Sequence, residues 1–330
     1  MSGVRALFLL LCGVLACGAA GGTNSFCAGV FPGRVKTVGV CMPASVLDKA
    51  KFDAGVAALK DAGYRVKLAP RLKFDGRASP QDRAADLADL WTDPEVDLVL
   101  CARGGSRVEH IVPFLDWNRL RTRPDQVLLG FSDITVLHNA FLAKGVGHPV
   151  SGPTMSAFPR ASRETKDWLR RALDGQPQPP VQLQVVKAGA CAGLPCGGHA
   201  HRYLIAHRLG IAGSARGKVV FLESEASIGL TLLGGTLDYL ATSGALDGCA
   251  GVVFGDLTPG LDEGVRRPGE SEADARTRAR DEVARMVRRF ADRVPCPVYE
   301  GFRYGHGATN LAVDHLRRVS VDAAGVMRWE

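Results

Sequence analysis

The chain has 330 residues, of which 46% are hydrophobic and 23% charged, so it can form one or two packed domains and is not a disordered chain. Its 39 glycines and 18 prolines follow no period, which excludes collagen-like and low-complexity proteins. The formal net charge is only +7, and basic residues alternate with acidic ones on predicted helices, so we predict no nucleic-acid partner.

Residues 1–20 have the pattern of an export signal. Arg5 precedes an apolar run, residues 6–16, which is too short to span a bilayer as a helix and ends in small residues. Residues 14–17 resemble a bacterial lipobox, so lipidation at Cys17 and ordinary signal cleavage near Ala20 both stay open. We expect the mature chain to be exported, either periplasmic or membrane-anchored as a lipoprotein.

The nine cysteines are too few for a dense disulfide scaffold. Loss or lipidation of the two in the signal leaves seven, so at least one stays unpaired. Cys191 and Cys196 lie in a loop-like stretch and are candidates for a disulfide in an oxidising compartment. Three others lie in apolar runs and are interpreted as small core residues: Cys41, Cys101 and Cys249.

The first half of the chain alternates strand and helix signals. The predicted strands cover residues 35–40, 64–68, 96–101 and 127–130, and the predicted helices cover 47–62, 79–91, 107–115 and 134–144. This order predicts an N-terminal α/β domain over residues 35–160, with a mostly parallel sheet flanked by helices.

The second half predicts another, mixed α/β domain. A helix over 162–173 stops at Gly175, and the Pro-rich residues 176–180 cannot be regular structure, so we assign 161–200 as a linker region and 201–330 as the C-terminal domain. Predicted elements there are strands over 217–222 and 251–254, a helix over 228–243 and a polar loop over 259–272. A further helix carries one apolar stripe at helical spacing: Val283, Met286, Val287 and Phe290.

Three loops follow strands of the predicted parallel sheet, at residues 43–45, 103–105 and 131–133. The carboxyl ends of such strands meet at one edge, where ligands bind. Ser132 lies in the sharp turn between a strand and a helix, a suitable place for a nucleophile. The N–H of Asp133 and one from Gly104–Gly105 would there hold a developing oxyanion. Alternatively, Ser132 or Asp133 is an ordinary helix cap.

A serine hydroxyl needs an imidazole to accept its proton, and the imidazole needs an acceptor of its own. His306 is the best candidate among eight histidines because glycines on both sides let the backbone come close to a reaction centre. Glu223 ends an apolar strand, where an isolated acid is costly unless paired. From these residues alone, a surface-loop histidine and a helix-capping acid remain open as alternatives. The Gly-x-Ser-x-Gly turn of α/β-hydrolases is absent, since residue 134 is isoleucine.

Four motifs, at residues 103–105, 129–138, 220–223 and 301–307, resemble in order and spacing those of the LD-carboxypeptidase family of serine peptidases. That family includes the murein tetrapeptide LD-carboxypeptidases and the microcin C resistance peptidases. The resemblance implies Ser132 as nucleophile, Glu223 as the acid that orients the base, and His306 as general base and then acid. It further implies a two-domain homodimer with no metal or other cofactor.

The family reaction implies a small peptide substrate, with release of the terminal D-alanine from murein tetrapeptide. Arg103 is a candidate for binding the substrate carboxylate, with a structural salt bridge as the alternative. The sequence departs from the family pattern in three places, which leaves the exact substrate open. Ser106 stands where a tyrosine commonly follows the two glycines, Ser224 replaces an acidic residue, and residues 197–200 read Gly-Gly-His-Ala instead of Gly-Gly-Asn-Leu.

Two interpretations from other classes remain open. An exported two-lobed ligand-binding protein would share the signal and the α/β halves without needing a nucleophile. A zinc site is the other, with four candidate ligands whose spacing fits no common pattern: Cys191, Cys196, His199 and His201. We predict no metal site, because export favours a disulfide over zinc at these cysteines.

Overall fold

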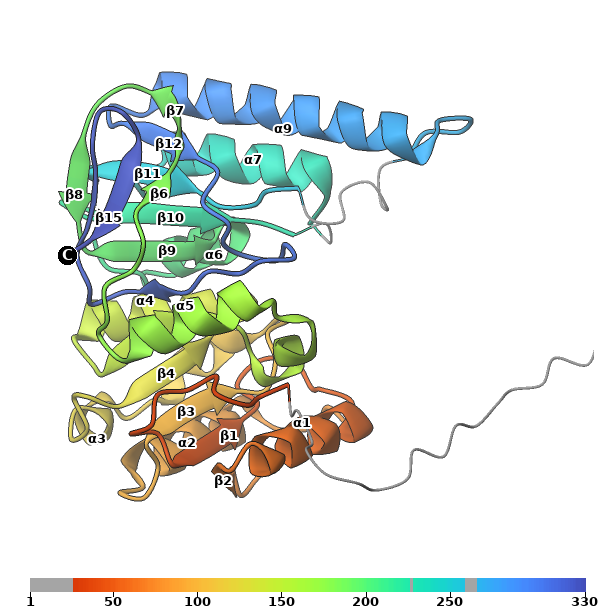
Figure 1. Ribbon diagram of the computed structural model, residues 1–330, viewed down its shortest axis with the longest axis vertical. Coiled ribbons are helices and arrows are strands. Elements are labelled where there is room, and N and C mark those ends of the chain that lie inside the picture. The colour runs from red at the N-terminus through yellow and green to blue at the C-terminus, as the bar shows by residue number, and fades with distance from the viewer. Residues whose placement is uncertain (1–25, 226–227, 259–265) are drawn as a thin grey trace, which may run out of the picture.

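The computed structural model describes residues 26–225, 228–258 and 266–330. The predicted signal peptide, with Cys17, lies outside these residues, as does part of the predicted polar loop at 259–272. Within the described ranges, no helix has the length and apolar character needed to cross a membrane. Figure 1 shows the chain as two stacked α/β halves, each with its own sheet.

The first half contains a six-stranded sheet in the order β13-β5-β4-β3-β1-β2. All neighbours are parallel except β13, which pairs antiparallel with β5. The strands are β1 (Thr37–Cys41), β2 (Arg65–Leu68), β3 (Leu98–Cys101), β4 (Val127–Gly130), β5 (His148–Ser151) and β13 (Val313–Asp314). The mostly parallel sheet predicted from the sequence is confirmed, and the C-terminal β13 extends it.

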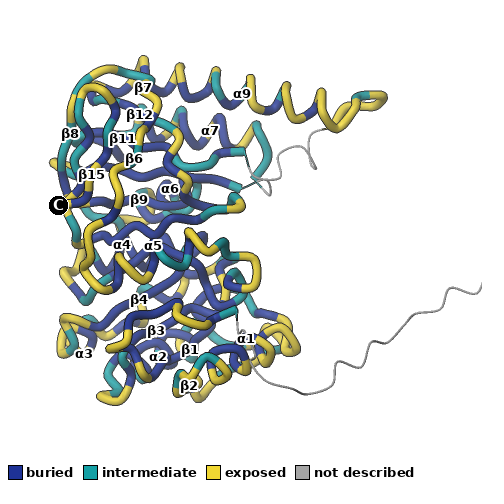
Figure 2. Tube along the Cα trace, in the orientation of Figure 1, coloured by how far each residue is buried: buried dark blue, intermediate teal, exposed yellow. Residues whose placement is uncertain are grey.

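Helices cover both faces of this sheet, because the central strands carry apolar side chains on both faces. Leu98 and Leu100 of β3 belong to a different buried cluster from Val99 and Cys101 on the opposite face. The helices are α1 (Lys49–Asp61), α2 (Pro80–Thr92), α3 (Trp117–Leu120), α4 (Thr135–Lys144) and α5 (Arg163–Leu173). Figure 2 shows the inner strands of this sheet as buried and parts of the covering helices, together with the edge strand β2, as partly exposed.

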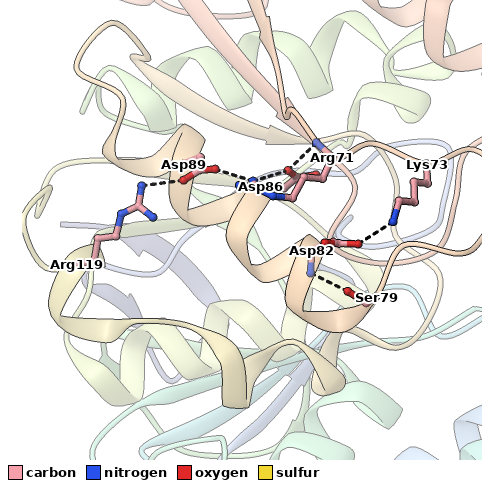
Figure 3. A network of polar contacts seen from close by, with 7 residues as sticks. All are labelled: Arg71, Lys73, Ser79, Asp82, Asp86, Asp89 and Arg119. Carbon is pink, nitrogen blue, oxygen red and sulfur yellow. Dashed lines mark hydrogen bonds and ion pairs between the residues drawn. The ribbon is translucent and has the colours of Figure 1, made fainter.

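Acidic residues of α2 hold the loop that follows β2 (Figure 3). Arg71 lies 3.3 Å from Asp86 and 2.6 Å from Asp89, and the Lys73 ammonium lies 2.9 Å from Asp82. Asp86 is buried, whereas the pairs made by Asp89 and Asp82 are more exposed and each contribute little to stability, at most ~1 kcal/mol. These contacts show basic residues paired with acids of a nearby helix.

The second half has a five-stranded sheet and a four-stranded sheet. Their orders are β7-β12-β11-β10-β9 and β6-β15-β14-β8. The first comprises β7 (Gln184–Lys187), β9 (Pro195–His199), β10 (Val219–Glu223), β11 (Gly251–Phe254) and β12 (Val298–Glu300). The second comprises β6 (Val181–Gln182), β8 (Cys191–Gly193), β14 (Val319–Val321) and β15 (Val326–Trp329).

Among the described residues, the helices of this half are α6 (Ala200–Arg208), α7 (Gly229–Thr242) and α9 (Glu272–Arg293). The apolar stripe predicted on α9 is buried at Val283, Met286, Val287 and Phe290. The Phe290 ring meets Phe254 of β11 edge-on at 5.1 Å between centroids. The amphipathic pattern therefore identified the face of α9 that covers the sheet. Together these elements confirm the mixed α/β fold class.

The segment 161–200, predicted as a linker region, carries α5 and the strands β6 to β9 as well as connecting residues. Residues 176–180 have no regular structure, as their prolines indicate. Cys191 and Cys196 are free thiols, so the disulfide considered for them is absent. The two residues lie on different strands, Cys191 on β8 of the four-stranded sheet and Cys196 on β9 of the five-stranded sheet.

The two halves meet along α4, which contacts α6 and β9. The Asn139 side chain in α4 donates to the Gly197 carbonyl at 2.8 Å and accepts from the Gly197 N–H at 3.2 Å. The Thr135 hydroxyl accepts from the His199 N–H at 2.9 Å. These bonds hold α4, which begins three residues after Ser132, against the second half of the chain.

Candidate active site

Ser132 occupies a strained turn at the rim of the first sheet. β4 ends at Gly130, Phe131 is extended, and Ser132 has φ of +64° before the chain turns into α4. This left-handed conformation is unfavourable for a residue with a side chain, by about 1 kcal/mol or more. Ser132 is also buried, with 6% of its surface exposed. A strained, buried serine held above a sheet edge is the geometry expected of a nucleophile, and an ordinary cap would not need it.

The loop after β3 comes very close to Ser132. A Cβ added at Gly104 would lie 2.7 Å from the Ser132 Cβ and 3.1 Å from its Oγ, so only glycine fits. Gly105 has φ of +121°, and the N–H of Ser106 donates to the Ser45 hydroxyl at 3.0 Å. The three loops predicted to converge, at 43–45, 103–105 and 131–133, are therefore in contact. Gly105 and Asp133, the predicted oxyanion-binding residues, lie on loops that adjoin Ser132.

Glu223 and His306 form a close pair in the second half. Glu223 ends β10 and is fully buried, and its Oε2 lies 2.7 Å from the His306 Nδ1. A carboxylate only accepts, so Nδ1 carries the proton and Nε2 is left with the basic lone pair. A Cβ at Gly305 would lie 2.3 Å from the Glu223 Oε2, which explains the glycine before the histidine. The structure brings these two predicted residues together as sequence reasoning required.

The charge around His306 favours its protonated form. Burial opposes the imidazolium, but the Glu223 carboxylate, with its charge and hydrogen bond, raises the pKa of His306 above its usual value. Glu225 and Asp256 add to this effect. The Glu223 Oε1 has no hydrogen-bond partner among the described residues. This carboxylate is therefore held mainly by the histidine.

The nucleophile turn and the histidine loop face one another. The ring of Phe131, the neighbour of Ser132, packs against the His306 imidazole with 4.8 Å between centroids. Both side chains line a cavity of about 270 Å³, together with Arg160, Thr165 and Asn310. The cavity therefore borders the candidate base and has room for a small peptide end group.

Two residues that the sequence argument did not assign to the site lie beside the imidazole. Glu225 has one oxygen 3.5 Å from the His306 Nε2 and the other 3.9 Å from the His199 Nε2. The His199 ring meets His306 edge-on at 5.6 Å. Burial, followed by the nearby charges of His306 and Arg202, lowers the pKa of His199 well below its usual value. His199 is thus a neutral group that borders the candidate base.

Asp133 is fully buried and makes contacts in two directions. Its Oδ2 accepts from the Val108 N–H at 3.0 Å, and its Oδ1 lies 3.1 Å from the Arg202 Nε. Burial raises the pKa of this carboxyl to about 6, although the Arg202 charge and the Val108 N–H oppose the rise. No local pattern in the sequence pointed to Arg202, because its partner Asp133 is distant in the chain and lies in the other half.

Arg103 is exposed and donates to the Val46 carbonyl at 3.1 Å. No salt bridge of Arg103 is found within the described ranges. The four zinc candidates also separate in the structure. His201 contacts the Thr236 hydroxyl at 3.2 Å, and His199 lies beside His306. Across the part of the chain that the structure describes, no three His, Cys, Asp or Glu residues form a group suited to a metal ion.

The sequence matches two domains that define a class of peptidase. Residues 38–151 match the LD-carboxypeptidase N-terminal domain, and residues 190–321 match the LD-carboxypeptidase C-terminal domain. The chain therefore belongs to the LD-carboxypeptidase family, as the motif resemblance indicated. A protein of Streptomyces coelicolor named as a carboxypeptidase is 32% identical over 240 residues, which cover 66% of this chain and 74% of that relative.

Two further comparisons cover nearly the whole chain. The murein tetrapeptide carboxypeptidase of Pseudomonas aeruginosa is 26% identical over 323 residues, covering 88% of this chain and 94% of that protein. A crystal structure of a MccF-like protein from Streptococcus pneumoniae in complex with AMP superposes with a TM-score of 0.73 at 18% identity. It covers 90% of this chain and 99% of that chain, and shows that the two share a fold.

Proposed function

We propose that this protein is a serine carboxypeptidase that cuts an L-D peptide bond and releases D-alanine from murein tetrapeptide. The observation that carries the proposal is the 2.7 Å contact between the His306 Nδ1 and Glu223, with the His306 ring packed against Phe131, the residue before the strained Ser132. The 26% identity to a murein tetrapeptide carboxypeptidase supports the choice of substrate.

The mechanism follows from the three side chains. The Ser132 Oγ attacks the carbonyl carbon of the scissile bond while the His306 Nε2 takes its proton. The resulting imidazolium is stabilised by Glu223, and the oxyanion is held by the N–H groups of Asp133 and Gly105. The tetrahedral intermediate then collapses: the C–N bond breaks, and His306 gives its proton to the amine of the departing D-alanine. Water attacks the acyl-enzyme by the same route and frees Ser132.

The substrate assignment is tested with a matched pair of peptides. Murein tetrapeptide ending in D-alanine and the same peptide ending in L-alanine are incubated with the protein, and the released alanine is measured by chiral chromatography. We expect release from the first peptide only, because only that peptide ends in the L-D bond that we propose the enzyme cuts. Release from neither, or from both equally, would contradict the proposed specificity.

Arg103 is proposed to bind the terminal carboxylate of the peptide. Its exposed guanidinium lies at the start of the glycine loop that contacts Ser132, and it retains donors beyond the one bonded to Val46. We expect Arg103→Ala to raise KM by about 10- to 100-fold with little change in kcat, the loss of one charge-assisted contact to the substrate. Arg163→Ala, at a highly exposed guanidinium on α5, is the control. A KM equal to that of the wild type would exclude this role.

Two alternatives have distinct outcomes in the same assays. A ligand-binding protein would leave Ser132 unreactive toward an alkyl fluorophosphonate, and it has no need for a strained serine or a buried Glu–His pair. A microcin C resistance-like peptidase would label at Ser132 but cut an aminoacyl sulfamoyl nucleotide in place of murein tetrapeptide. Labelling and the two substrates therefore separate all three functions.

We also propose that the mature chain is exported, to the periplasm or to the membrane with a lipid at Cys17, and that it forms a homodimer. The support is the signal-like pattern of residues 1–20 and the family resemblance. Fractionation of cells that produce the full chain, with intact mass of the N-terminal peptide, tests the first point. Sedimentation of the purified protein tests the second, and a purely cytoplasmic or monomeric protein would contradict them.

A further inference from the structure

Arg202 of α6 reaches from the second half of the chain to both loops that adjoin Ser132. Its Nε lies 3.1 Å from the Asp133 Oδ1, and its Nη2 donates to the Gly105 carbonyl at 2.9 Å. The side chain is 19% exposed, and Asp133 is completely buried. One guanidinium thus joins the nucleophile turn to the glycine loop.

The contact with Gly105 restricts the glycine loop. The peptide group between Gly105 and Ser106 is held at both of its polar atoms, because its oxygen accepts from Arg202 and its N–H donates to the Ser45 hydroxyl. Gly105 itself has φ of +121°, in a region open mainly to glycine. Because the peptide group between Gly105 and Ser106 is held, only the φ and ψ angles of Gly105 set the direction of the Gly105 N–H.

The contact with Asp133 restricts the nucleophile turn. Asp133 follows Ser132 directly, and its Oδ2 ties the turn to the Val108 N–H. A buried carboxylate without a cation is costly, so the turn needs Arg202 to keep Asp133 ionised in this place. Arg83 and Glu109 are the other charged groups that act on Asp133, and Arg83 is occupied by the Pro43 and Arg107 carbonyls.

We propose that Arg202 is a positioning residue that sets the geometry of the oxyanion site by holding Gly105 and Asp133 at the same time. The inference rests on the proposed function of Ser132 but not on the identity of the peptide. A planar guanidinium presents several donors in a fixed fork and can bind two acceptors on different loops. A lysine ammonium at this place would keep a charge near Asp133 without that fork.

The test compares three variants: Arg202→Gln, Arg202→Lys and Arg208→Gln. Arg208 is an exposed arginine near the end of the same helix and serves as the matched control. The first readout is the rate at which an alkyl fluorophosphonate labels Ser132, since in this phosphonylation fluoride leaves and the phosphonyl oxygen occupies the oxyanion site. We expect labelling to fall by about 100-fold in Arg202→Gln, the scale found when an oxyanion donor is lost, and by ~10-fold in Arg202→Lys. Arg208→Gln should label at the wild-type rate.

A purely structural role would not produce the other two expected results. In D-alanine release, kcat should fall while KM stays within about 2-fold of the wild type, as expected for an interaction made in the transition state. The acid limb of the pH–activity profile of Arg202→Gln should move to higher pH. Burial raises the pKa of Asp133, and the variant lacks the Arg202 charge that opposes this rise.

Thermal melting shows whether each variant is folded. If Arg202→Gln does not fold, Arg202→Lys decides: a folded lysine variant that labels Ser132 at the wild-type rate would overturn the proposal. A folded glutamine variant with wild-type labelling would overturn it as well. If the wild type labels but releases no D-alanine, the proposed substrate is wrong, and the labelling rates of the variants still test Arg202.

Discussion

Ser132→Ala is expected to abolish release of D-alanine, with kcat lowered by at least about 10⁴-fold and binding of the peptide retained. The reason is that no other hydroxyl occupies the strained turn at the end of β4, where Gly104 leaves room for the Ser132 side chain. Substrate affinity should change little, because the Oγ contributes mainly to bond formation. Initial rates with murein tetrapeptide and calorimetric titration of the variant measure the two quantities.

Ser214→Ala is the control for this experiment. Ser214 is exposed in the segment between α6 and β10, where its hydroxyl accepts from the Arg216 N–H. Its loss should leave both kcat and KM unchanged. Substantial turnover by a folded Ser132→Ala protein would mean that water is activated directly at His306, and the acyl-enzyme mechanism would have to be abandoned.

Glu223→Gln is expected to lower kcat by about 10²- to 10⁴-fold and to move the acid limb of kcat/KM to lower pH. His306 acts as a base only when neutral, so activity requires a pH above its pKa. Glu223 is the principal group that raises this pKa, against the opposing effect of burial. With an uncharged amide in its place, the pKa falls and the neutral imidazole persists to lower pH, while the imidazolium that forms during the reaction loses its stabilising charge.

Glu300→Gln provides a matched control. Glu300 is the last residue of β12 and Glu223 is the last residue of β10, and the two strands belong to the same sheet. No contact with His306 is found for Glu300 among the described residues. Profiles of kcat/KM against pH should therefore coincide for this control and the wild type. An unmoved acid limb in Glu223→Gln would show that another group, with Glu225 the nearest candidate, sets the titration.

The opposite shifts expected for Glu223→Gln and Arg202→Gln offer a further check on the site. The first removes an anion from the base, and the second removes a cation from Asp133. Loss of an anion lowers the pKa of a nearby group and loss of a cation raises it, so shifts in the same direction would contradict the electrostatic role of one of the two residues.

Local patterns in the sequence predicted much of the framework. Apolar runs identified β1 to β4 and β10, and the spacing of four apolar residues identified the buried face of α9. Short strands with weak patterns were missed, among them β5, β6 and β8, whereas the short strands at the end of the chain were expected without exact bounds. Two-residue strands such as β13 carry no periodicity, because their register is set by the neighbour they pair with.

The sequence by itself determined the chemistry available at the rim: a serine in a strand-to-helix turn, glycines beside it and beside His306, and an acid at the end of an apolar strand. These are local signals, since turns and close approaches restrict residue type at single positions. Only the tertiary structure decided which side chains surround them. Arg202 reaches Asp133 through the packing of one half on the other, and His199 and Glu225 reach His306 through contacts within the second half. Contacts between separate segments of the chain leave no periodic trace in either segment.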